Sequence, residues 1–468
     1  MTISRRHFLR QAACAAVGTT SIASTVWNLR AINAAAAQAM SGSTEFRALV
    51  CLFLYGGNDA NNMIVPNDNT NYAAYAAARG PIALPQASLL SLNPATPDGQ
   101  GRTFGLHPSM PELQSLFNTD KKLALMANVG TLVEPTTQMQ FLNGTAKLPG
   151  QLFSHADQQI EWQTGWPDAP PTSGWGGRMA DLLTSFNSAD AVSMSISVAG
   201  TNTFQVGRNI FEYQVSPDGA VDLTGFGNQD GQIRYQAVQD LLNLPHQNLF
   251  EAEFAKITNR AIANNAILTS ALSGVTINTP FPVNSDLSDQ LLMIAKLISA
   301  RQALGMRRQI FFCSVGGFDT HSNEVATQTS LLGELSQCMN AFYQATKELG
   351  ISDRVTLFTA SDFSRTYQCN GSGSDHAWGS HALVLGGSVK GGDIYGAYPS
   401  LVLGGPDDVG EGRWLPSTSV DEYSGTLAKW YGAFSPSDLA NVLPNIGRFP
   451  KPDIGFLNQL PAPDPPGS

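Results

Sequence analysis

Cysteine is scarce in this chain: 468 residues contain five, and no two form a Cys-x-x-Cys pair. Cys14 falls in the first forty residues, and Cys51 and Cys313 lie in apolar, strand-like runs. A disulfide-stabilised fold needs denser cysteines in a shorter chain, and zinc and haem sites need characteristic spacings. We therefore interpret these residues as buried thiols, and cysteine chemistry is excluded as the function.

Basic side chains are also few, with 27 Lys and Arg against 37 Asp and Glu, for a net charge of -10. Residues 1–40 hold four arginines and no acid, so the remainder has 23 basic and 37 acidic residues, or -14. Such a surface repels phosphate backbones and anionic lipids. Nucleic-acid binding is therefore not expected.

Long apolar runs are missing, including near the amino terminus. Ser4-Arg5-Arg6-His7-Phe8-Leu9-Arg10 is a twin-arginine pattern, and Ala37-Gln38-Ala39 offers a cleavage site. The stretch between them is interrupted by Thr and Ser and is shorter than the roughly 20 apolar residues of a membrane span, which was the alternative. Residues 1–39 are predicted to be a signal peptide. We expect the twin-arginine translocase as an export partner, a periplasmic or secreted location and no stable membrane insertion.

Short apolar runs rich in Val, Leu and Phe alternate with longer helical patterns. Strands are predicted at Ala48–Leu54, Leu123–Asn128, Val192–Val198, Gln309–Val315, Arg354–Thr359 and Ala382–Leu385. Helices are predicted at Pro108–Phe117, Gly176–Ser185, Ile233–Leu272, Ser285–Leu304, Glu324–Leu349 and Val420–Tyr431. Strands separated by helices imply βαβ units, because parallel strands need long crossovers. The predicted fold is α/β, a doubly wound, mostly parallel sheet with helices on both faces.

Two stretches interrupt this alternation. Residues 60–106 are rich in Asn, Ala, Pro and Gly, and residues 201–231 are rich in Gly, Asn and Asp. They are interpreted as surface excursions, and a long polar helical segment follows the second. We expect residues 40–468 to form a single large domain with a helical insertion at 201–275.

Three predicted strands run into segments that contain aspartate. These segments are Gly56-Gly57-Asn58-Asp59, Gly316-Gly317-Phe318-Asp319 and Ser361-Asp362. Ligands of open α/β sheets bind outside the carboxyl ends of the strands, so Asp59, Asp319 and Asp362 are candidates for one site. The alternative for each is a turn former or helix cap.

Three of the seven histidines fall in the same part of the chain. His321 follows Asp319, and a polar loop contains Asp375, His376 and His381. Asp and His without cysteine form a ligand set that suits one or two divalent ions, Zn²⁺, Mn²⁺, Mg²⁺ or Ca²⁺ according to geometry. Paired metals that share aspartates are a common device for phosphate or sulfate ester cleavage. The alternative for a single loop histidine is a solvated side chain.

Ser154 is a candidate nucleophile because it is predicted to lie at a helix start, where backbone N–H groups favour an anion. Plain N-capping, with Asp157 three residues on, is the alternative. Arg365 follows Asp362 and could bind free anion oxygens in a bidentate manner, or it could be a structural arginine.

These motifs together resemble domain-of-unknown-function family 1501, a group of exported, sulfatase-like proteins in the alkaline phosphatase superfamily. The resemblance extends over nearly the whole mature chain. Its most specific pieces are Leu54–Asn62, Phe153-Ser154-His155, Gly174–Met179, Gly317-Phe318-Asp319-Thr320-His321, Ser361–Thr366 and Asp375–Gly379.

The resemblance implies a role for each candidate. Asp59 resembles the first-strand metal aspartate, and Ser154 the helix-capping nucleophile. Asp319 and His321 resemble one Asp/His pair. In the second Asp/His pair, Asp362 resembles the aspartate, and His376 or His381 resembles the histidine that follows later in the chain.

This chain also departs from the superfamily pattern. One residue separates Asp319 from His321 where the phosphatases have three, and Phe363 stands where a metal histidine would follow Asp362. The second metal is then absent, or bound by Asp375 and His376. The Cys/Ser-x-Pro-x-Arg signature of formylglycine sulfatases is missing near Ser154.

Our first hypothesis is an exported, metal-dependent hydrolase of small or polymeric phosphate or sulfate esters, in which Ser154 attacks and Arg365 stabilises the charge. The alternative is a catalytically lapsed relative that binds an anion or a partner in the cell envelope. A calcium-stabilised surface protein is a third reading, based on the Asn/Asp-rich loops near Asn58–Asn71.

Overall fold

The computed structural model describes residues 45–187, 192–219 and 229–458, and the predicted signal peptide lies outside them. None of the helices within these ranges is long and apolar enough to cross a membrane.

The central feature of the domain is a nine-stranded sheet, in the order β11-β5-β10-β9-β1-β8-β6-β7, with β12 also paired to β5. Its strands are β1 (Arg47–Leu54), β5 (Leu123–Gly130), β6 (Ser195–Ser197), β7 (Tyr213–Gln214), β8 (Arg308–Val315), β9 (Val355–Ser361), β10 (Ser380–Gly386), β11 (Ile394–Tyr395) and β12 (Thr418–Ser419). β1 is entirely buried between β8 and β9, and pairs with both in parallel register. Such continuous apolar runs are typical of strands covered on both faces.

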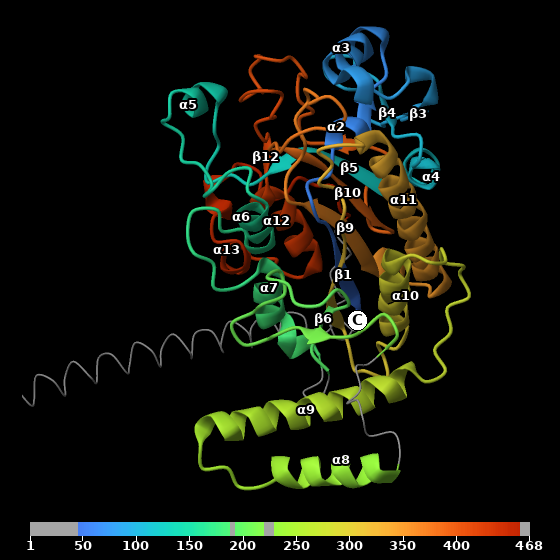
Figure 1. Cartoon of the computed structure of the whole chain (residues 1–468), viewed down its shortest axis with the longest axis vertical. Coiled ribbons are helices and arrows are strands. Elements are labelled where there is room, and N and C mark those ends of the chain that lie inside the picture. Colours follow the sequence, from blue (N-terminus) through green and yellow to red (C-terminus); the bar gives the residue numbers. More distant parts are fainter. Residues whose placement is uncertain (1–44, 188–191, 220–228, 459–468) are drawn as a thin grey trace, which may run out of the picture. The chain divides into compact units, whose positions relative to one another are not determined.

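Helices cover the two faces of this sheet, as predicted. In Figure 1, α4 (Pro111–Asn118), α10 (Asp286–Ser299) and α11 (Glu324–Glu348) lie on one face. The other face carries α6 (His155–Thr164), α7 (Trp175–Leu183), α12 (Val420–Tyr431) and α13 (Pro436–Val442). The α/β fold with a mostly parallel sheet is therefore confirmed. The exception to parallel pairing is β10, which is antiparallel to both of its neighbours.

Residues 60–106 form more regular structure than the predicted surface excursion. They contain α2 (Ala60–Met63), α3 (Asn69–Arg79) and a small antiparallel sheet of β2 (Ile64–Pro66), β4 (Phe104–Leu106) and β3 (Leu90–Ser91). Tyr75 and Arg79 of α3 are fully buried. A short helix, α5 (Gln138–Leu142), follows β5, and single 3-10 turns lie at Gly80–Ile82, Gln86–Ser88, Thr184–Phe186, Ser352–Arg354 and Ile446–Arg448.

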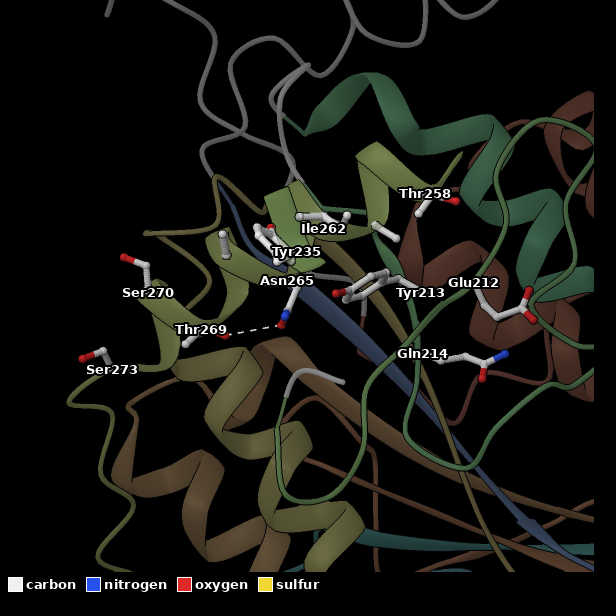
Figure 2. A pocket seen from close by; sticks show the side chains of 12 residues that line it. Glu212, Tyr213, Gln214, Tyr235, Thr258, Ile262, Asn265, Thr269, Ser270 and Ser273 are labelled. Atoms are coloured by element: carbon white, nitrogen blue, oxygen red, sulfur yellow. Dashed lines mark hydrogen bonds between the residues drawn. The ribbon is translucent and has the colours of Figure 1, made fainter. Parts of the chain in front are cut away.

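The region after β7 contains two helices where the sequence predicted one. They are α8 (Gln229–Leu242) and α9 (Leu249–Leu272), which contact each other. The single helix at Ile233–Leu272 was wrong because Pro245 breaks the helical hydrogen bonding. A cavity of about 1000 Å³ lies between β7 and this pair of helices (Figure 2).

Candidate metal centre

The carboxyl ends of β8 and β9, the two neighbours of β1, deliver polar side chains to one place. β8 ends at Val315 and leads to Asp319 and His321, and β9 ends at Ser361 and leads to Asp362. Gly56 follows β1 with φ +115°, and a Cβ there would lie 2.4 Å from the backbone nitrogen of Asp319. Only glycine allows the loops after β1 and β8 to approach this closely.

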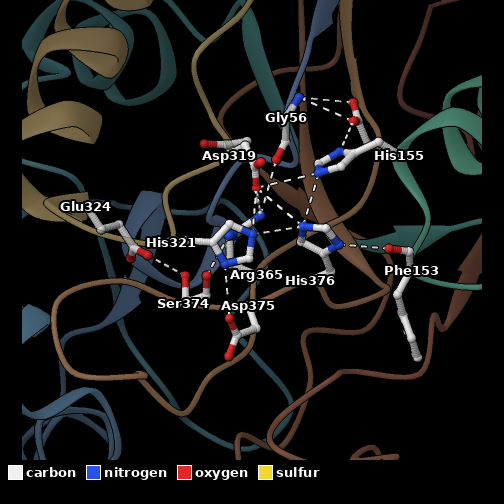
Figure 3. Close-up of polar contacts among 12 residues, drawn as sticks. Gly56, Phe153, His155, Asp319, His321, Glu324, Arg365, Ser374, Asp375 and His376 are labelled. Carbon is white, nitrogen blue, oxygen red and sulfur yellow. Dashed lines mark hydrogen bonds and ion pairs between the residues drawn. The ribbon is translucent and has the colours of Figure 1, made fainter.

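Three imidazoles and one carboxylate converge at this edge of the sheet (Figure 3). His155, Asp319 and His376 form a group with metal-ligand spacing. His376 Nε2 lies 3.0 Å from His155 Nε2 and 3.3 Å from Asp319 Oδ1. His321 Nε2 lies 3.0 Å from both His376 Nε2 and Asp319 Oδ1.

Each of the three histidines has an acceptor at its other ring nitrogen. His155 Nδ1 is 2.6 Å from Asp362 Oδ2, and His321 Nδ1 is 3.0 Å from Asp375 Oδ1. His376 Nδ1 is 2.8 Å from the carbonyl oxygen of Phe153. Acceptors at Nδ1 favour the tautomer with the proton there and the lone pair on Nε2. Facing lone pairs repel one another unless a cation lies between them, so the donor set fits a metal ion.

The segment that supplies the carbonyl to His376 has an unusual backbone. Phe153 has φ +70°, in the left-handed region that non-glycine residues rarely adopt. Ser154 then occupies the N-cap position of α6 without a side-chain capping bond, and His155 is the first helical residue. Strain of this kind, of order 1–3 kcal/mol, is concentrated at functional sites.

The surroundings favour the metal-binding forms of Asp319 and His376, whereas they draw His155 toward its protonated form. Burial opposes ionisation of Asp319, but the hydrogen bond and charge of Arg365 outweigh it and lower its pKa. Burial lowers the pKa of His376 and keeps it neutral, despite the carbonyl of Phe153. The hydrogen bond to Asp362 raises the pKa of His155 against the effect of burial.

Phe363 forms an apolar wall beside the cluster. It is fully buried, and its ring centroid is 4.7 Å from those of both His155 and His376. A Cβ on Gly57 would come within 2.5 Å of this ring. Phe363 therefore packs against two of the imidazoles and offers no ligand atom to the cluster.

Arg365, Asp362 and Asp375 lie at the cluster, each in contact with one of its members. Arg365 is fully buried, and its Nη1 donates to Asp319 Oδ1 over 2.8 Å. Its remaining donations go to the carbonyls of Gly56 and Ser374. The structure thus places Arg365 behind Asp319.

The structure does not bring Asp59 or His381 to the cluster. Asp59 caps α2 and forms a buried ion pair with Arg79. His381 lies in β10, where its Nδ1 accepts from the backbone N–H of Asn128 over 3.0 Å. Asp59 has a buried cation as its partner, and the buried ring of His381 packs against Tyr398, 4.8 Å between ring centroids.

Ser154 is the residue that precedes α6, as predicted, but its side chain does not cap the backbone. Its Oγ donates to Asp157 Oδ2 over 2.6 Å. This contact leaves the hydroxyl hydrogen-bonded to a carboxylate that can accept its proton.

The sequence interpretation did not include His155 among the candidate ligands. Its position next to Ser154 could have predicted this place. A residue that follows a candidate nucleophile at a helix start is also expected to lie near the site. Arg413 was missed as well. Its Nε donates to the carbonyl of His376 over 2.8 Å, and its side chain is partly exposed.

A buried ionic network holds the loops of the centre together. Arg79 Nη2 contacts both Asp59 and Glu324 Oε1, the latter over 2.6 Å. Glu324 accepts in turn from Ser374, two residues before His376. Arg79 Nη1 also donates to the carbonyl of Thr366 over 2.8 Å. The network therefore joins segments that follow β1, β8 and β9.

Glu161 of α6 makes stability depend on pH. It is 5% exposed, and burial raises its pKa to about 8 from 4.5. Because the folded state binds this proton more tightly than the unfolded state, its contribution is complete below pH 4.5 and is lost as pH rises toward 8. We expect Glu161→Gln to raise the free energy of unfolding at pH 8 by up to a few kcal/mol, and to change it little at pH 4.5.

Urea unfolding of parent and variant at the two pH values measures this difference. Glu134→Gln, at a partly exposed surface position, is the control. A Glu161→Gln protein that is less stable than the parent at pH 8 would contradict the prediction.

Comparison with known proteins identifies a family. The family described as Protein of unknown function (DUF1501) matches residues 47–405. No curated protein matches the chain.

Several solved structures are similar in part. Ps i-CgsB in complex with k-i-k-neocarrahexaose is 11% identical, with 87% of this chain and 78% of that chain covered and a TM-score of 0.32. The PsFucS1 sulfatase from Pseudoalteromonas sp. is 9% identical, with 78% and 68% covered and a TM-score of 0.31. The alkaline phosphatase PafA mutant is 11% identical, with 69% and 64% covered and a TM-score of 0.23.

Proposed function

Because the chain belongs to the DUF1501 family, whose match spans every residue of the metal centre, we propose that it is a metal-dependent hydrolase of phosphate or sulfate esters. The observation that carries the proposal is the convergence of three imidazole Nε2 atoms on Asp319 Oδ1, each imidazole having an acceptor at Nδ1.

The donor set favours one kind of ion. Imidazole nitrogens together with a carboxylate oxygen suit Zn²⁺, whereas Mg²⁺ and Ca²⁺ prefer oxygen ligands. His155, Asp319 and His376 would hold this ion, and His321 Nε2 lies beside them, 3.0 Å from Asp319 Oδ1. The proposal is one metal ion, because Asp59 is paired with Arg79 and Phe363 offers no ligand.

The chemistry follows from the groups around the donors. When bound, a divalent ion supplies a Lewis acid beside the ester and lowers the pKa of water. Ser154 Oγ would form a bond to phosphorus or sulfur as the bond to the ester oxygen breaks, and Asp157 would accept the serine proton. The departing alkoxide would take a proton from solvent and leave as the alcohol. Water would then cleave the seryl ester. Arg365 would fix Asp319, and Arg413 would supply positive charge to the anion.

Metal analysis tests the proposal. The purified protein is expected to contain about one equivalent of transition metal by mass spectrometry, and His155→Ala is expected to lose most of it. His246→Ala, at a histidine outside the centre, is the matched control. Hydrolysis of p-nitrophenyl phosphate, bis(p-nitrophenyl) phosphate and p-nitrophenyl sulfate should follow the metal content. A folded protein with no metal under zinc-replete conditions would contradict the proposal.

A second candidate function is an anion-binding protein without turnover. The observation that favours it is Phe363, which packs against two imidazoles in place of a second metal ligand. Stoichiometric metal, no hydrolysis of the three esters and saturable binding of inorganic phosphate would select this candidate. Turnover that is lost in His155→Ala would dismiss it.

Export remains a proposal that depends on the twin-arginine pattern at Arg5-Arg6. The absence of a membrane-spanning helix among the described residues is compatible with it. Fractionation of cells that express the chain would test it, and protein retained in the cytoplasm at full length would contradict it.

A further inference from the structure

A second cavity lies away from the metal centre, in the region predicted from the sequence to be a helical insertion. It has a volume of about 1000 Å³ and is lined by residues of α8, of α9 and of the segment that contains β7. β7 is the edge strand of the central sheet. In Figure 1, α8 and α9 lie beyond the amino ends of the strands, whereas α2 and α6 lie toward the carboxyl ends. The two sites are therefore separate.

Most residues that line this cavity carry a polar group, and almost none of them is charged. Nine of the twelve lining residues carry a hydroxyl, amide or carboxyl group. Among these twelve there is one acid, Glu212, and no Lys, Arg or His. An anionic ligand would find no positive charge here, and an apolar ligand would strip water from polar groups without replacing their hydrogen bonds.

Two tyrosines add flat apolar surfaces to this polar lining. Tyr213 of β7 is half-buried, and burial raises its pKa, so the phenol stays neutral. Tyr235 comes from α8. In Figure 2 the two rings lie in the middle of the lining, with Thr269, Ser270 and Ser273 toward one end and Glu212 and Gln214 toward the other.

The geometry points to a binding site for an uncharged oligosaccharide. A sugar ring has hydroxyl groups that both donate and accept, as Thr258, Thr269 and Ser270 do. Its C–H faces pack against aromatic rings, as the amphipathic tyrosine side chain allows. The volume is at the upper end of the range for ligand sites, which accommodates several sugar rings. This inference does not depend on the proposed function, because it uses no residue of the metal centre.

Calorimetric titration of the full chain with neutral and charged hexasaccharides tests the inference. The neutral probes are cellohexaose, maltohexaose and hexa-N-acetylchitohexaose, and the charged probe is a heparin hexasaccharide. At least one neutral probe is expected to bind with a Kd of about 1 mM or tighter, and the heparin probe at least tenfold more weakly. No neutral binding at this level, or preferred binding of heparin, would overturn the inference.

Matched variants locate the binding. Tyr213→Ala and Tyr235→Ala are each expected to weaken the neutral probe at least tenfold, whereas Tyr395→Ala, on a tyrosine outside the cavity, should have no effect. Glu212→Gln should change the Kd less than threefold, because an amide still accepts a hydrogen bond. His155→Ala should also leave it unchanged. Binding that survives both cavity tyrosine variants, in protein that melts as the parent does, would overturn the inference.

Discussion

Asp319→Ala is expected to lose its bound metal and to be less stable than the parent, because one carboxylate serves two partners. Asp319 Oδ1 lies with the imidazole nitrogens and also accepts from Arg365 Nη1. Without it, the fully buried Arg365 has lost its counter-charge. Removing one member of such a pair costs about 3–5 kcal/mol when both are buried, so with Asp319 half-exposed we expect the lower part of that range or less.

Asp319→Asn separates the two effects. The amide oxygen still accepts from Arg365, but it is a weaker metal ligand, so this variant should melt near the parent when both are metal-free. Its metal affinity should nevertheless fall by at least the 10–100-fold that changes outside the ligand set cause. Competition with a chromophoric chelator measures the affinity, and calorimetry after EDTA treatment measures the stability. A metal affinity like that of the parent in both variants would show that Asp319 is not a metal ligand.

Arg79→Met is expected to have the largest effect on stability alone. Arg79, Asp59 and Glu324 are all essentially excluded from solvent. Burial and the charge of Asp59 raise the pKa of Glu324, while Arg79 lowers it. Without Arg79 two buried carboxyl groups would share a site, so one would have to bind a proton. We expect a loss of about 3–5 kcal/mol in the free energy of unfolding.

Chemical denaturation of parent and variant measures this loss. Lys147→Met, which breaks an exposed pair with Glu134, is the control and should change the free energy by less than about 1 kcal/mol. If Arg79→Met cannot be purified, Arg79→Lys keeps the charge with fewer donors and should show an intermediate loss. An Arg79→Lys protein as stable as the parent, with unchanged metal content, would show that the network is not needed.

The sequence predicted the fold well where apolar runs were long. β1, β8 and β9 were found within two residues of their ends because strands covered on both faces are continuously apolar. The antiparallel direction of β10 could not be predicted, since a short apolar run is the same pattern in either direction. Pro245 could have predicted the break between α8 and α9, but the sequence interpretation did not use it.

Some residues of the candidate site could be predicted because they follow strands that the sequence also predicts. Asp319, His321 and Asp362 follow strand ends, which sequence patterns locate. His155 is the first residue of α6, and only the structure shows that its imidazole contacts Asp362, the residue that follows β9. Asp59 also follows a predicted strand, but it pairs with Arg79 and not with the cluster. Arg79 lies in a segment that its composition predicted to be at the surface, so this buried pair could not be predicted.

The central position of β1 has a consequence for synthesis of the chain. Arg47 pairs with Arg308, so this fully buried, mostly apolar strand leaves the ribosome some 260 residues before its neighbour β8 exists. At about 5–20 residues per second, β1 waits for roughly 10–50 s with both edges unpaired. An unpaired apolar strand is a template for aggregation. Production of this protein should therefore depend on a holding chaperone during that interval, and slower translation should lower the soluble yield.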